Sequence, residues 1–496
     1  MTRGFAPLLL ILAFAAGCGR AGNRPLVIGS KVFTESVVLG EVLTQAARAA
    51  GAPAEHRREL GGTRILFEAL KRGDIDAYVE YTGTISEELV PGVDHAAMPA
   101  ALAAAGISMT KPLGFNNTYA IGMMAGQADR LGIRTISDLA RHPTLEIGFS
   151  NEFMNRADGW PSLRARYALP HARVRGLDHD LAIRALAAGQ IAVTDLYSTD
   201  AEIRAYGLRV LDDDGRHFPG YQAVVLYRAD AAARAGAAIA AWNALSGRLD
   251  EAGMIAMNAR VKIDGVPDAR VAADFLEATT GQTAGVDMAT RPARMLARAR
   301  EHLLMVAISL AAAIAIGLPL GVLAAKRRRI GRIVLAAVAI VQTVPSLALL
   351  VFMIPLLGIG TWPAIAALFL YSLLPIVRNT HQGLTGIAAE LKDSARALGL
   401  PAAAVLRRIE LPLASPAIVA GIKTAAVINV GTATLGALIG AGGFGQPILT
   451  GIRLADTSLI LEGAIPAALL ALLAQALLDG AERVIVPKGL RLARGR

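Results

Sequence analysis

The chain has 496 residues, of which 54% are hydrophobic and 5% aromatic, and its formal net charge is +10. Such a length exceeds one ordinary domain, and the apolar content exceeds that of most soluble proteins, so two unlike parts are expected. The positive charge does not indicate nucleic-acid binding, because Lys and Arg cluster at the ends of apolar runs with few aromatic residues between them. We therefore expect a water-soluble half up to about residue 290 and a membrane half after it.

Residues 1–18 have the plan of a signal peptide. Arg3 precedes an apolar core that is too short to cross a bilayer as a helix, and small residues then lead to Cys18. Because Cys18 is the only cysteine, no intramolecular disulfide can form. Its position resembles a bacterial lipobox, with Ala15 where leucine is commoner, and predicts lipidation at Cys18; ordinary cleavage and an uncleaved anchor are the alternatives. The following residues are expected to be exported.

Residues 25–285 are expected to form the exported domain. Apolar strands such as 26–28 and 145–149 alternate there with helical patterns such as 36–50 and 63–71. This alternation predicts α/β units around a largely parallel sheet. The segment is long enough for two lobes with a ligand in the cleft between them.

Five segments of this domain carry a more specific pattern. They are Gly29–Glu35 (GSKVFTE), Gly61–Thr63 (GGT), Gly73–Thr84 (GDIDAYVEYTGT), Asn116–Tyr119 (NNTY) and Thr194–Tyr197 (TDLY). Together they resemble the substrate-binding proteins of glycine betaine, carnitine and choline importers. The resemblance implies a two-lobed periplasmic-binding-protein fold of type II and a ligand with a quaternary ammonium group.

A quaternary ammonium group cannot donate a hydrogen bond, so aromatic ring faces are the usual means of holding it. The resemblance implies a cage of four tyrosines. These are Tyr81, Tyr119, Tyr197 and Tyr221, the last within Phe218–Tyr221 (FPGY).

A betaine also carries a carboxylate, which needs cationic or hydroxyl donors. The resemblance implies Lys31, Thr84 and Arg156 for that role, with Asn117 shaping the wall. The neighbours of Tyr81, namely Asp76, Tyr78 and Glu80, are expected to serve the fold, because alternate residues of a strand face opposite ways.

The membrane half is predicted to be an all-α permease domain over residues 303–485, after a linker at 286–302. Its five apolar segments reach or approach the roughly 20 residues that a spanning helix needs: 303–325, 333–357, 361–377, 416–441 and 458–480. The linker contains four basic residues, Arg291, Arg294, Arg298 and Arg300, which are expected on a surface helix at the lipid headgroups.

Basic loops predict the orientation of these spans. Lys326–Arg329 with Arg332 follow the first span, Arg378 follows the third, and Arg483 and Lys488 follow the fifth. With five spans all of them lie on one side, which is then the cytoplasm of a bacterial inner membrane. The binding domain is expected on the opposite, periplasmic or extracellular side.

Residues 393–412 (DSARALGLPAAAVLRRIELP) resemble the coupling loop of ABC importer permeases of the MetI-like type. The matching positions are Asp393, Ala395, Gly399, Ile409, Leu411 and Pro412, with Asp-Ser-Ala in place of the usual Glu-Ala-Ala. We expect a short helix ended by Gly399 and a second helix stopped before Pro412, which together form a knob for a partner. The resemblance implies that this partner is the ATP-hydrolysing subunit.

The chain contains no phosphate-binding G-x-x-x-x-G-K-[ST] motif, so ATP must be handled by another polypeptide. No metal-ligand spacing or nucleophile motif is present either, and we expect no cofactor and no enzymatic activity. The sequence is thus interpreted as an ABC importer subunit that works as a pair of copies with a separate ATPase.

Two other functional classes share part of this plan. A ligand-gated channel or sensor shares the plan of a binding domain on a membrane anchor, but the 393–412 loop argues against it. An exported enzyme needs only one anchor. Within the transporter class, glycine betaine, proline betaine, carnitine, choline and ergothioneine carry the same cation, and Lys31 and Arg156 favour a carboxylated ligand over choline.

Overall fold

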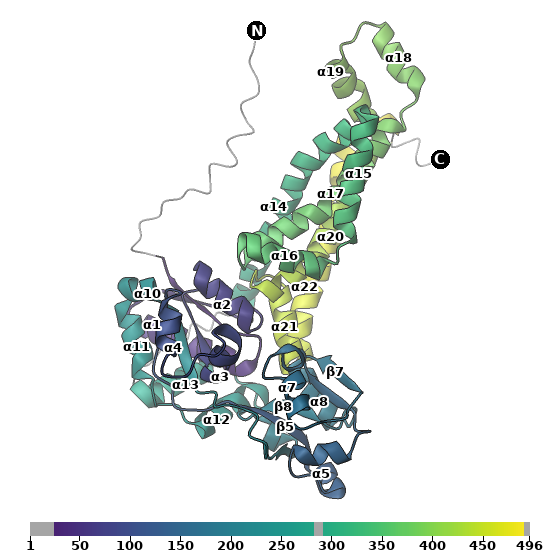
Figure 1. Cartoon of the computed structure of the whole chain (residues 1–496). Helices are drawn as coiled ribbons and strands as arrows, with labels where there is room; N and C mark the ends of the chain where they lie inside the picture. The colour runs from purple at the N-terminus through teal and green to yellow at the C-terminus, as the bar shows by residue number, and fades with distance from the viewer. Residues whose placement is uncertain (1–23, 282–290, 491–496) are drawn as a thin grey trace.

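The computed structural model describes residues 24–281 and 291–490, so the signal peptide and Cys18 lie outside the described residues. An α/β domain occupies one end of the molecule, and long helices extend from it (Figure 1). The α/β domain has two lobes. We call residues 24–115 and 222–281 lobe 1, and residues 118–220 lobe 2.

Lobe 1 is built on a five-stranded sheet of order β2-β1-β3-β10-β4. Its strands are β1 (Leu26–Gly29), β2 (Ala54–Arg57), β3 (Ala77–Tyr81), β4 (Ile107–Met109) and β10 (Ala223–Arg228). Its helices are α1 (Thr34–Ala49), α2 (Thr63–Arg72), α3 (Thr82–Thr84), η2 (Ile85–Leu89), α4 (Met98–Ala103), α10 (Ala229–Arg234), α11 (Gly236–Ala244), α12 (Glu251–Lys262) and α13 (Asp268–Thr280). β1 is buried along its length, as expected for a strand covered on both faces.

Lobe 2 contains a three-stranded sheet of order β8-β5-β9 and the separate pair β6-β7. Its strands are β5 (Tyr119–Met124), β6 (Ile147–Ser150), β7 (Val174–Leu177), β8 (Thr194–Tyr197) and β9 (Leu208–Leu211). Its helices are α5 (Ala125–Leu131), η3 (Ser137–Arg141), α6 (Asn151–Asn155), α7 (Trp160–Arg166), α8 (His179–Ala187) and α9 (Glu202–Ala205).

The prediction of a largely parallel sheet is confirmed in part: four of the five strands of the lobe 1 sheet run in one direction, β10 runs against them, and β6 and β7 of lobe 2 are parallel. β1 pairs in parallel with β2 and β3, but β10 is antiparallel to both β3 and β4, and β5 is antiparallel to both β8 and β9. The chain leaves lobe 1 after β4 and returns before β10, so the returning strand enters the first sheet in the opposite direction. The chain therefore crosses between the lobes twice, and an antiparallel bridge between Asn116 and Gln222 joins the two crossing segments.

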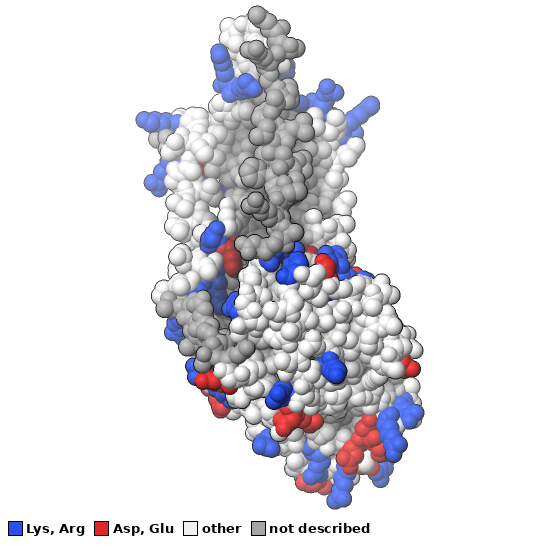
Figure 2. Space-filling view, turned by 90° about the vertical axis from the view of Figure 1, so that its left-hand side faces the viewer, with Lys and Arg blue, Asp and Glu red and all other residues white. Residues whose placement is uncertain are grey.

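Within the described residues 291–490, the membrane half has four helices that are long and apolar enough to span a bilayer, and a fifth span if a bent pair is counted as one. The helices of this half are α14 (Arg291–Lys326), α15 (Arg328–Thr343), α16 (Ser346–Leu357), α17 (Thr361–Thr385), α18 (Ala389–Ala397), α19 (Ala402–Val405), η4 (Leu406–Glu410), α20 (Leu411–Thr432), η5 (Ala433–Ile439), α21 (Gly445–Leu454) and α22 (Thr457–Ile485). Lys and Arg gather near the far end and near the α/β domain, with a mostly uncharged band between them (Figure 2).

Two segments of this half differ from the sequence predictions. The basic segment that we assigned to a linker is helical from Arg291 and continues without a break into the first apolar run. The second apolar run is not one helix, because α15 and α16 meet at an angle of 100°. Pro345 explains the bend, since a proline disfavours helical backbone at the preceding residue, and Val344 is extended there.

The coupling loop lies at the end of the bundle farthest from the α/β domain (Figure 1). α18 ends as predicted, with Gly399 in the left-handed conformation at a φ of 77°. The prediction that the next helix stops before Pro412 is wrong, because residues 402–439 form one continuous helical stretch. A π-helical turn over Leu406–Glu410 precedes the proline and accommodates its missing N–H.

Small and polar residues pack the membrane helices together. A Cβ on Gly321 of α14 would lie 2.5 Å from Thr380 of α17, and one on Gly421 of α20 would lie 2.6 Å from a carbonyl of α17. The buried Asn429 side chain donates to Ser309 of α14 (3.0 Å) and accepts from Ser372 of α17 (2.9 Å). These contacts hold α14, α17 and α20 close, as is usual for helices surrounded by lipid.

We expect Trp242→Ala to destabilise lobe 1 by about 3–5 kcal/mol, because this fully buried indole fills the core and donates to the carbonyl of Leu43 (2.9 Å). Hydrogen exchange measured on the whole protein should then accelerate in α1 by at least about 100-fold. Tyr206→Ala, at a ring that is 39% exposed, serves as the control and should leave α1 unchanged. Unchanged protection of α1 in the tryptophan variant would contradict the core assignment.

Candidate functional site

One cavity collects all eight residues that the sequence proposed for ligand binding. Most of them come from the ends of strands and from the crossings between the lobes, while Thr84 ends α3 and Arg156 directly follows α6. The lining residues are Lys31, Phe33, Tyr81, Thr84, Asn117, Tyr119, Glu152, Arg156, Tyr197 and Tyr221. Sequence reasoning missed Phe33 and Glu152, although Phe33 lies inside the GSKVFTE segment and Glu152 lies just before Arg156.

Strand pairing places the rings. Tyr119 opens β5 and is the register partner of Tyr197, which ends β8, while Tyr81 ends β3 opposite the first residue of β10. The ring centroids of Tyr119 and Tyr197 are 5.2 Å apart, and those of Tyr119 and Tyr221 are 5.9 Å apart at an angle of 82°. Phe33 completes the ring set, 5.3 Å from Tyr197 and 6.4 Å from Tyr81.

Two cations of the protein lie over these ring faces. The guanidinium carbon of Arg156 is 5.2 Å from the centroid of Tyr119, and the Lys31 nitrogen is 5.5 Å from that of Tyr81. Burial raises the pKa of Tyr81 and Tyr119 well above that of an exposed phenol, so the rings are neutral at physiological pH. Neutral ring faces attract cations through the quadrupole of the π-system.

Both cations are already held by carboxylates. Lys31 Nζ donates to Glu80 Oε1 (2.5 Å) and to the Thr63 hydroxyl (3.0 Å). Arg156 donates through Nε and Nη2 to the two oxygens of Asp158, at 2.7 and 2.6 Å. Sequence reasoning treated the two cations as a clamp and did not foresee these partners. Buried ion pairs are expected here, because an unpaired charge is costly to remove from water.

The cavity is almost filled by its own side chains. Its free space is about 20 Å³, which is room for roughly one water molecule. Next to it lies a cleft of about 380 Å³ between the lobes, which shares Phe33, Glu152, Arg156 and Tyr197 with the cavity. A ligand larger than water can enter only if the lobes or these shared side chains move apart.

Glu35, at the start of α1, ties together the elements behind the cavity. Its carboxylate accepts hydrogen bonds from the Tyr81 hydroxyl (2.5 Å), the Asn117 amide (2.8 Å), the Thr199 hydroxyl and the Asn258 amide (3.1 Å). Burial raises the pKa of Glu35, and these donors oppose the rise. Glu35, which we call the hub, thus links lobe 1, lobe 2 and the segment that crosses between them. It also fixes the position of the Tyr81 hydroxyl.

His179 supports the Tyr197 ring from the other side. The two rings stack at 4.2 Å, and His179 Nε2 lies 3.0 Å from Asp200, which also accepts from the Tyr197 backbone N–H. Burial alone would lower the pKa of His179, but Asp200 and Asp195 outweigh it and raise the pKa well above its ordinary value. The two carboxylates therefore favour the imidazolium form of the stacked ring.

We expect the stabilisation from His179 to fade at alkaline pH. The folded-state pKa is raised, so the contribution is complete below the unfolded value of about 6.5 and is lost as pH rises through the folded-state pKa. In thermal unfolding between pH 6 and 10, His179→Gln should be clearly less stable than the wild type at pH 6, and the difference should shrink as pH rises. The exposed His95→Gln is the control; a difference for His179→Gln that is constant with pH would refute the assignment.

The side chains that line the site suit the binding of a small molecule. In residues 24–281 and 291–490, no group of three or more His, Cys, Asp or Glu is placed to hold a metal ion. Aromatic faces, paired ions and hydroxyls can hold a small ligand by cation–π contacts and hydrogen bonds.

Comparison with known families gives two matches along the chain. Residues 24–278 match the model described as "Substrate binding domain of ABC-type glycine betaine transport system". Residues 317–490 match the "Binding-protein-dependent transport system inner membrane component". The two matches lie in the α/β domain and in the helical half respectively.

Curated relatives match the helical half. The choline transport system permease protein OpuBB of Bacillus subtilis is 40% identical over 202 residues, which are 41% of this chain and 93% of that protein. The osmoprotectant import permease protein OsmW of Salmonella typhimurium is 43% identical over 196 residues, 38% of this chain and 91% of that protein. A solved structure described as a glycine betaine/carnitine/choline ABC transporter is 27% identical, covers 51% of this chain and 98% of its own, and has a TM-score of 0.43.

Proposed function

Because this chain belongs to the substrate-binding domain family of ABC-type glycine betaine transport systems, and carries an inner-membrane permease domain in the same polypeptide, we propose that it captures a betaine-type solute and imports it. The observation that carries this proposal is the set of five aromatic rings around one cavity at the lobe crossing. The relatives named above transport choline or osmoprotectants, which agrees with a quaternary ammonium ligand.

The cation of the ligand is proposed to replace the protein's own cation at the ring faces. Arg156 now lies over Tyr119, so this ring face already accommodates a positive group. A trimethylammonium group can take that place if the lobes open, the guanidinium moves aside and the lobes close again. Cation–π contacts in a desolvated cage contribute about 2 kcal/mol or more each.

The carboxylate of the ligand is proposed to bind Arg156 and Lys31. Nε and Nη2 of Arg156 are used by Asp158, whereas Nη1 lies 3.9 Å from Glu152, too far for a hydrogen bond. Nη1 therefore offers a charge-assisted donor to a carboxylate that enters the cavity. Thr84 lines the same cavity and offers a hydroxyl. This arrangement favours a betaine over choline, which has no carboxylate.

Transport requires partners beyond this chain. We assign ATP hydrolysis to a separate subunit that docks on the coupling loop, where Leu398 at the tip is 80% exposed. Basic residues on the coupling-loop side support a cytoplasmic location for that end and an outer location for the binding domain. Only 6% of the residues in the most apolar stretch of α22 are buried, which leaves a surface for lipid or for a second copy of the chain.

We expect Tyr197→Ala to weaken binding of glycine betaine by about 1–2 kcal/mol or more, roughly 5- to 30-fold, because it removes one ring of the cage. Calorimetry on the full-length protein in nanodiscs, with glycine betaine, carnitine, choline and ergothioneine as the panel, measures the change. Tyr197→Phe keeps the ring and should bind nearly normally, and Tyr206→Ala is the surface control. Failure of every quaternary ammonium to bind would refute the cage, and choline binding more tightly than the betaines would refute the carboxylate assignment.

The coupling loop generates a separate prediction. Leu398→Glu should lower ligand-stimulated ATP hydrolysis of the assembled transporter by about tenfold or more, because a charge replaces an exposed apolar contact at the proposed ATPase interface. Ligand binding should be unchanged, since the loop lies at the opposite end of the molecule (Figure 1). Leu398→Met is the matched control. Normal stimulation in the glutamate variant would place the ATPase contact elsewhere.

A further inference from the structure

One face of α21 contacts a single glutamate of lobe 1. Glu59 accepts hydrogen bonds from Gln446 Nε2 (2.7 Å), Thr450 Oγ1 (3.0 Å) and Arg453 Nε (2.7 Å). The three donors are spaced four and three residues apart, which places them on one side of the helix. The side chains of Glu59 and Arg453 are only 4% and 5% exposed, so this ion pair is buried between the two halves of the chain.

The backbone of Glu59 is in an uncommon conformation. Its φ is 58°, a left-handed value that residues other than glycine seldom adopt. Such strain persists only where surrounding contacts hold it, and it often marks a functional position. The three donors of α21 are contacts of this kind.

The end of α21 contacts both lobes. Arg453 Nη1 donates to the Thr34 hydroxyl of lobe 1 (2.8 Å). From lobe 2, Arg184 of α8 donates to the carbonyl of Ile452 (3.0 Å). A relative movement of the lobes must therefore alter at least one of these contacts.

The lobe 1 contacts lie next to the ligand cavity in the sequence and in space. Thr34 lies between Phe33, which lines the cavity, and Glu35, the hub behind it. Ser30, which precedes Lys31, contacts both His56 (2.9 Å) and the backbone N–H of Glu59 (3.3 Å). The permease helix is thus connected to the cavity wall through short chains of hydrogen bonds.

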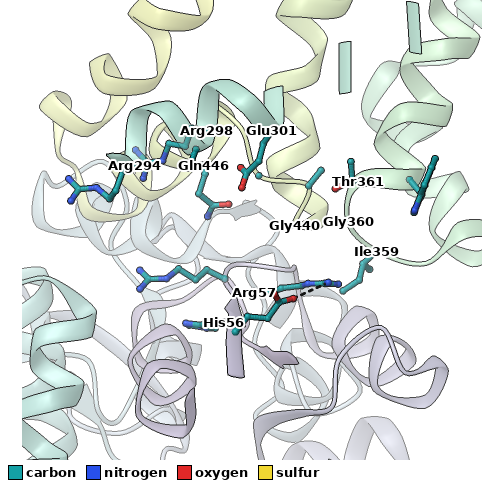
Figure 3. Close-up of a pocket in the computed structure, with 16 residues that line it drawn as sticks. His56, Arg57, Arg294, Arg298, Glu301, Ile359, Gly360, Thr361, Gly440 and Gln446 are labelled. Atoms are coloured by element: carbon teal, nitrogen blue, oxygen red, sulfur yellow. Dashed lines mark hydrogen bonds and ion pairs between the residues drawn. The ribbon is translucent and has the colours of Figure 1, made fainter. Parts of the chain in front are cut away.

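The interface combines these polar contacts with apolar ones, because Leu60 of lobe 1 belongs to one buried apolar cluster with Met305 and Ile439 of the helical half, and it is incompletely packed. A cavity of about 610 Å³ lies beside the contact of Glu59 with α21. Figure 3 shows Arg57 and His56 of the binding domain on one wall and Arg294, Arg298 and Glu301 of α14 on the other. Interfaces between domains of one chain generally resemble transient interfaces, so we expect that the contact can open and close.

We propose that the face of α21 formed by Gln446, Thr450 and Arg453 is the docking surface for the binding domain of the same chain, and that one permease domain contacts both lobes through it. Only nine residues separate Gly281 from Arg291, a span of at most about 35 Å. A connection this short gives an effective concentration in the millimolar range, which favours the binding domain of the same chain over that of a second copy. The inference goes beyond the proposed function and does not depend on which solute binds.

Disulfide cross-linking of the full-length protein tests this docking. A Cβ on Gly358 would lie 3.0 Å from Cγ of Asp74, which brings two cysteines at these positions within disulfide range and leaves the α21 contacts intact. In a Cys18→Ser background, Asp74→Cys with Gly358→Cys in one chain should give an intrachain cross-link under mild oxidation. Chains that carry only one of the two cysteines, with different tags and expressed together, should give almost no cross-linked dimer. A dominant dimer would show docking on a second copy. Because Gly358 has a φ of 80°, the cysteine variant is first checked for its normal circular dichroism and thermal unfolding, and a folded variant without any cross-link would overturn the docked arrangement.

Variants of the α21 contact test the role of its residues. Glu59→Gln and Arg453→Gln should each slow the intrachain cross-link by about tenfold or more, because each leaves a buried charge without its partner. Arg184→Ala should slow it to a lesser extent, and Arg173→Gln, at a side chain that is 83% exposed, is the control. An unchanged rate in both Glu59→Gln and Arg453→Gln would refute the role of the α21 face. The assay needs no ligand, so its outcome is independent of any failure to bind a quaternary ammonium solute.

Discussion

A charged side chain that leaves water must find a partner, and this requirement shapes both the cavity and the contact between the two halves of the protein. Lys31 is held by Glu80, Arg156 by Asp158, and Glu59 by Arg453. Removal of one member of such a pair generally costs about 3–5 kcal/mol, because the other charge stays buried. A ligand that carries both charges can exchange with these partners without leaving a charge uncompensated, which suits a zwitterion better than a simple cation.

The sequence predicted which tyrosine rings line the cavity, but it did not predict that Arg156 and Lys31 lie over two of them. The four tyrosines lie at a strand end, at a strand start or just before a strand, in segments that resemble a known family. The resemblance alone brought Tyr81 and Tyr197 into one hypothesis, although they are 116 residues apart in the sequence. Nothing local predicts that Glu80 faces Lys31, because alternation along a strand indicates only opposite faces. Glu152 and Glu35 were missed for a similar reason. Acidic residues are common near the start of a helix, and the sequence does not tell whether such a residue lines a cavity, accepts buried hydrogen bonds or faces solvent.

In the membrane half, too, some features were predictable from the sequence and others were not. The apolar segments fall almost entirely within long helices of the structure, apart from the second one, which is bent. Such lengths are those that the hydrocarbon thickness requires of a spanning helix. The bend at Pro345 and the continuous helix through Pro412 depend on whether neighbouring backbone can satisfy the groups that a proline frees, which is a tertiary property. The pairing of Glu59 with Arg453 joins residues almost four hundred positions apart, so neither side chain could be distinguished from an ordinary surface charge before folding.

The short connection between Gly281 and Arg291 also fixes the ratio of binding domains to permease domains at one to one. Each permease domain is synthesised with one binding domain, so a cell cannot raise the number of receptors per transporter by making more of a free receptor. A binding domain that stays within a few tens of ångströms of its permease domain does not have to diffuse back to it between transport cycles. A soluble competitor at micromolar concentration is at a disadvantage, because the effective concentration of the attached binding domain is millimolar. The number of binding domains in such a system therefore rises and falls with the number of permease domains, and import can proceed no faster than the attached binding domain captures solute.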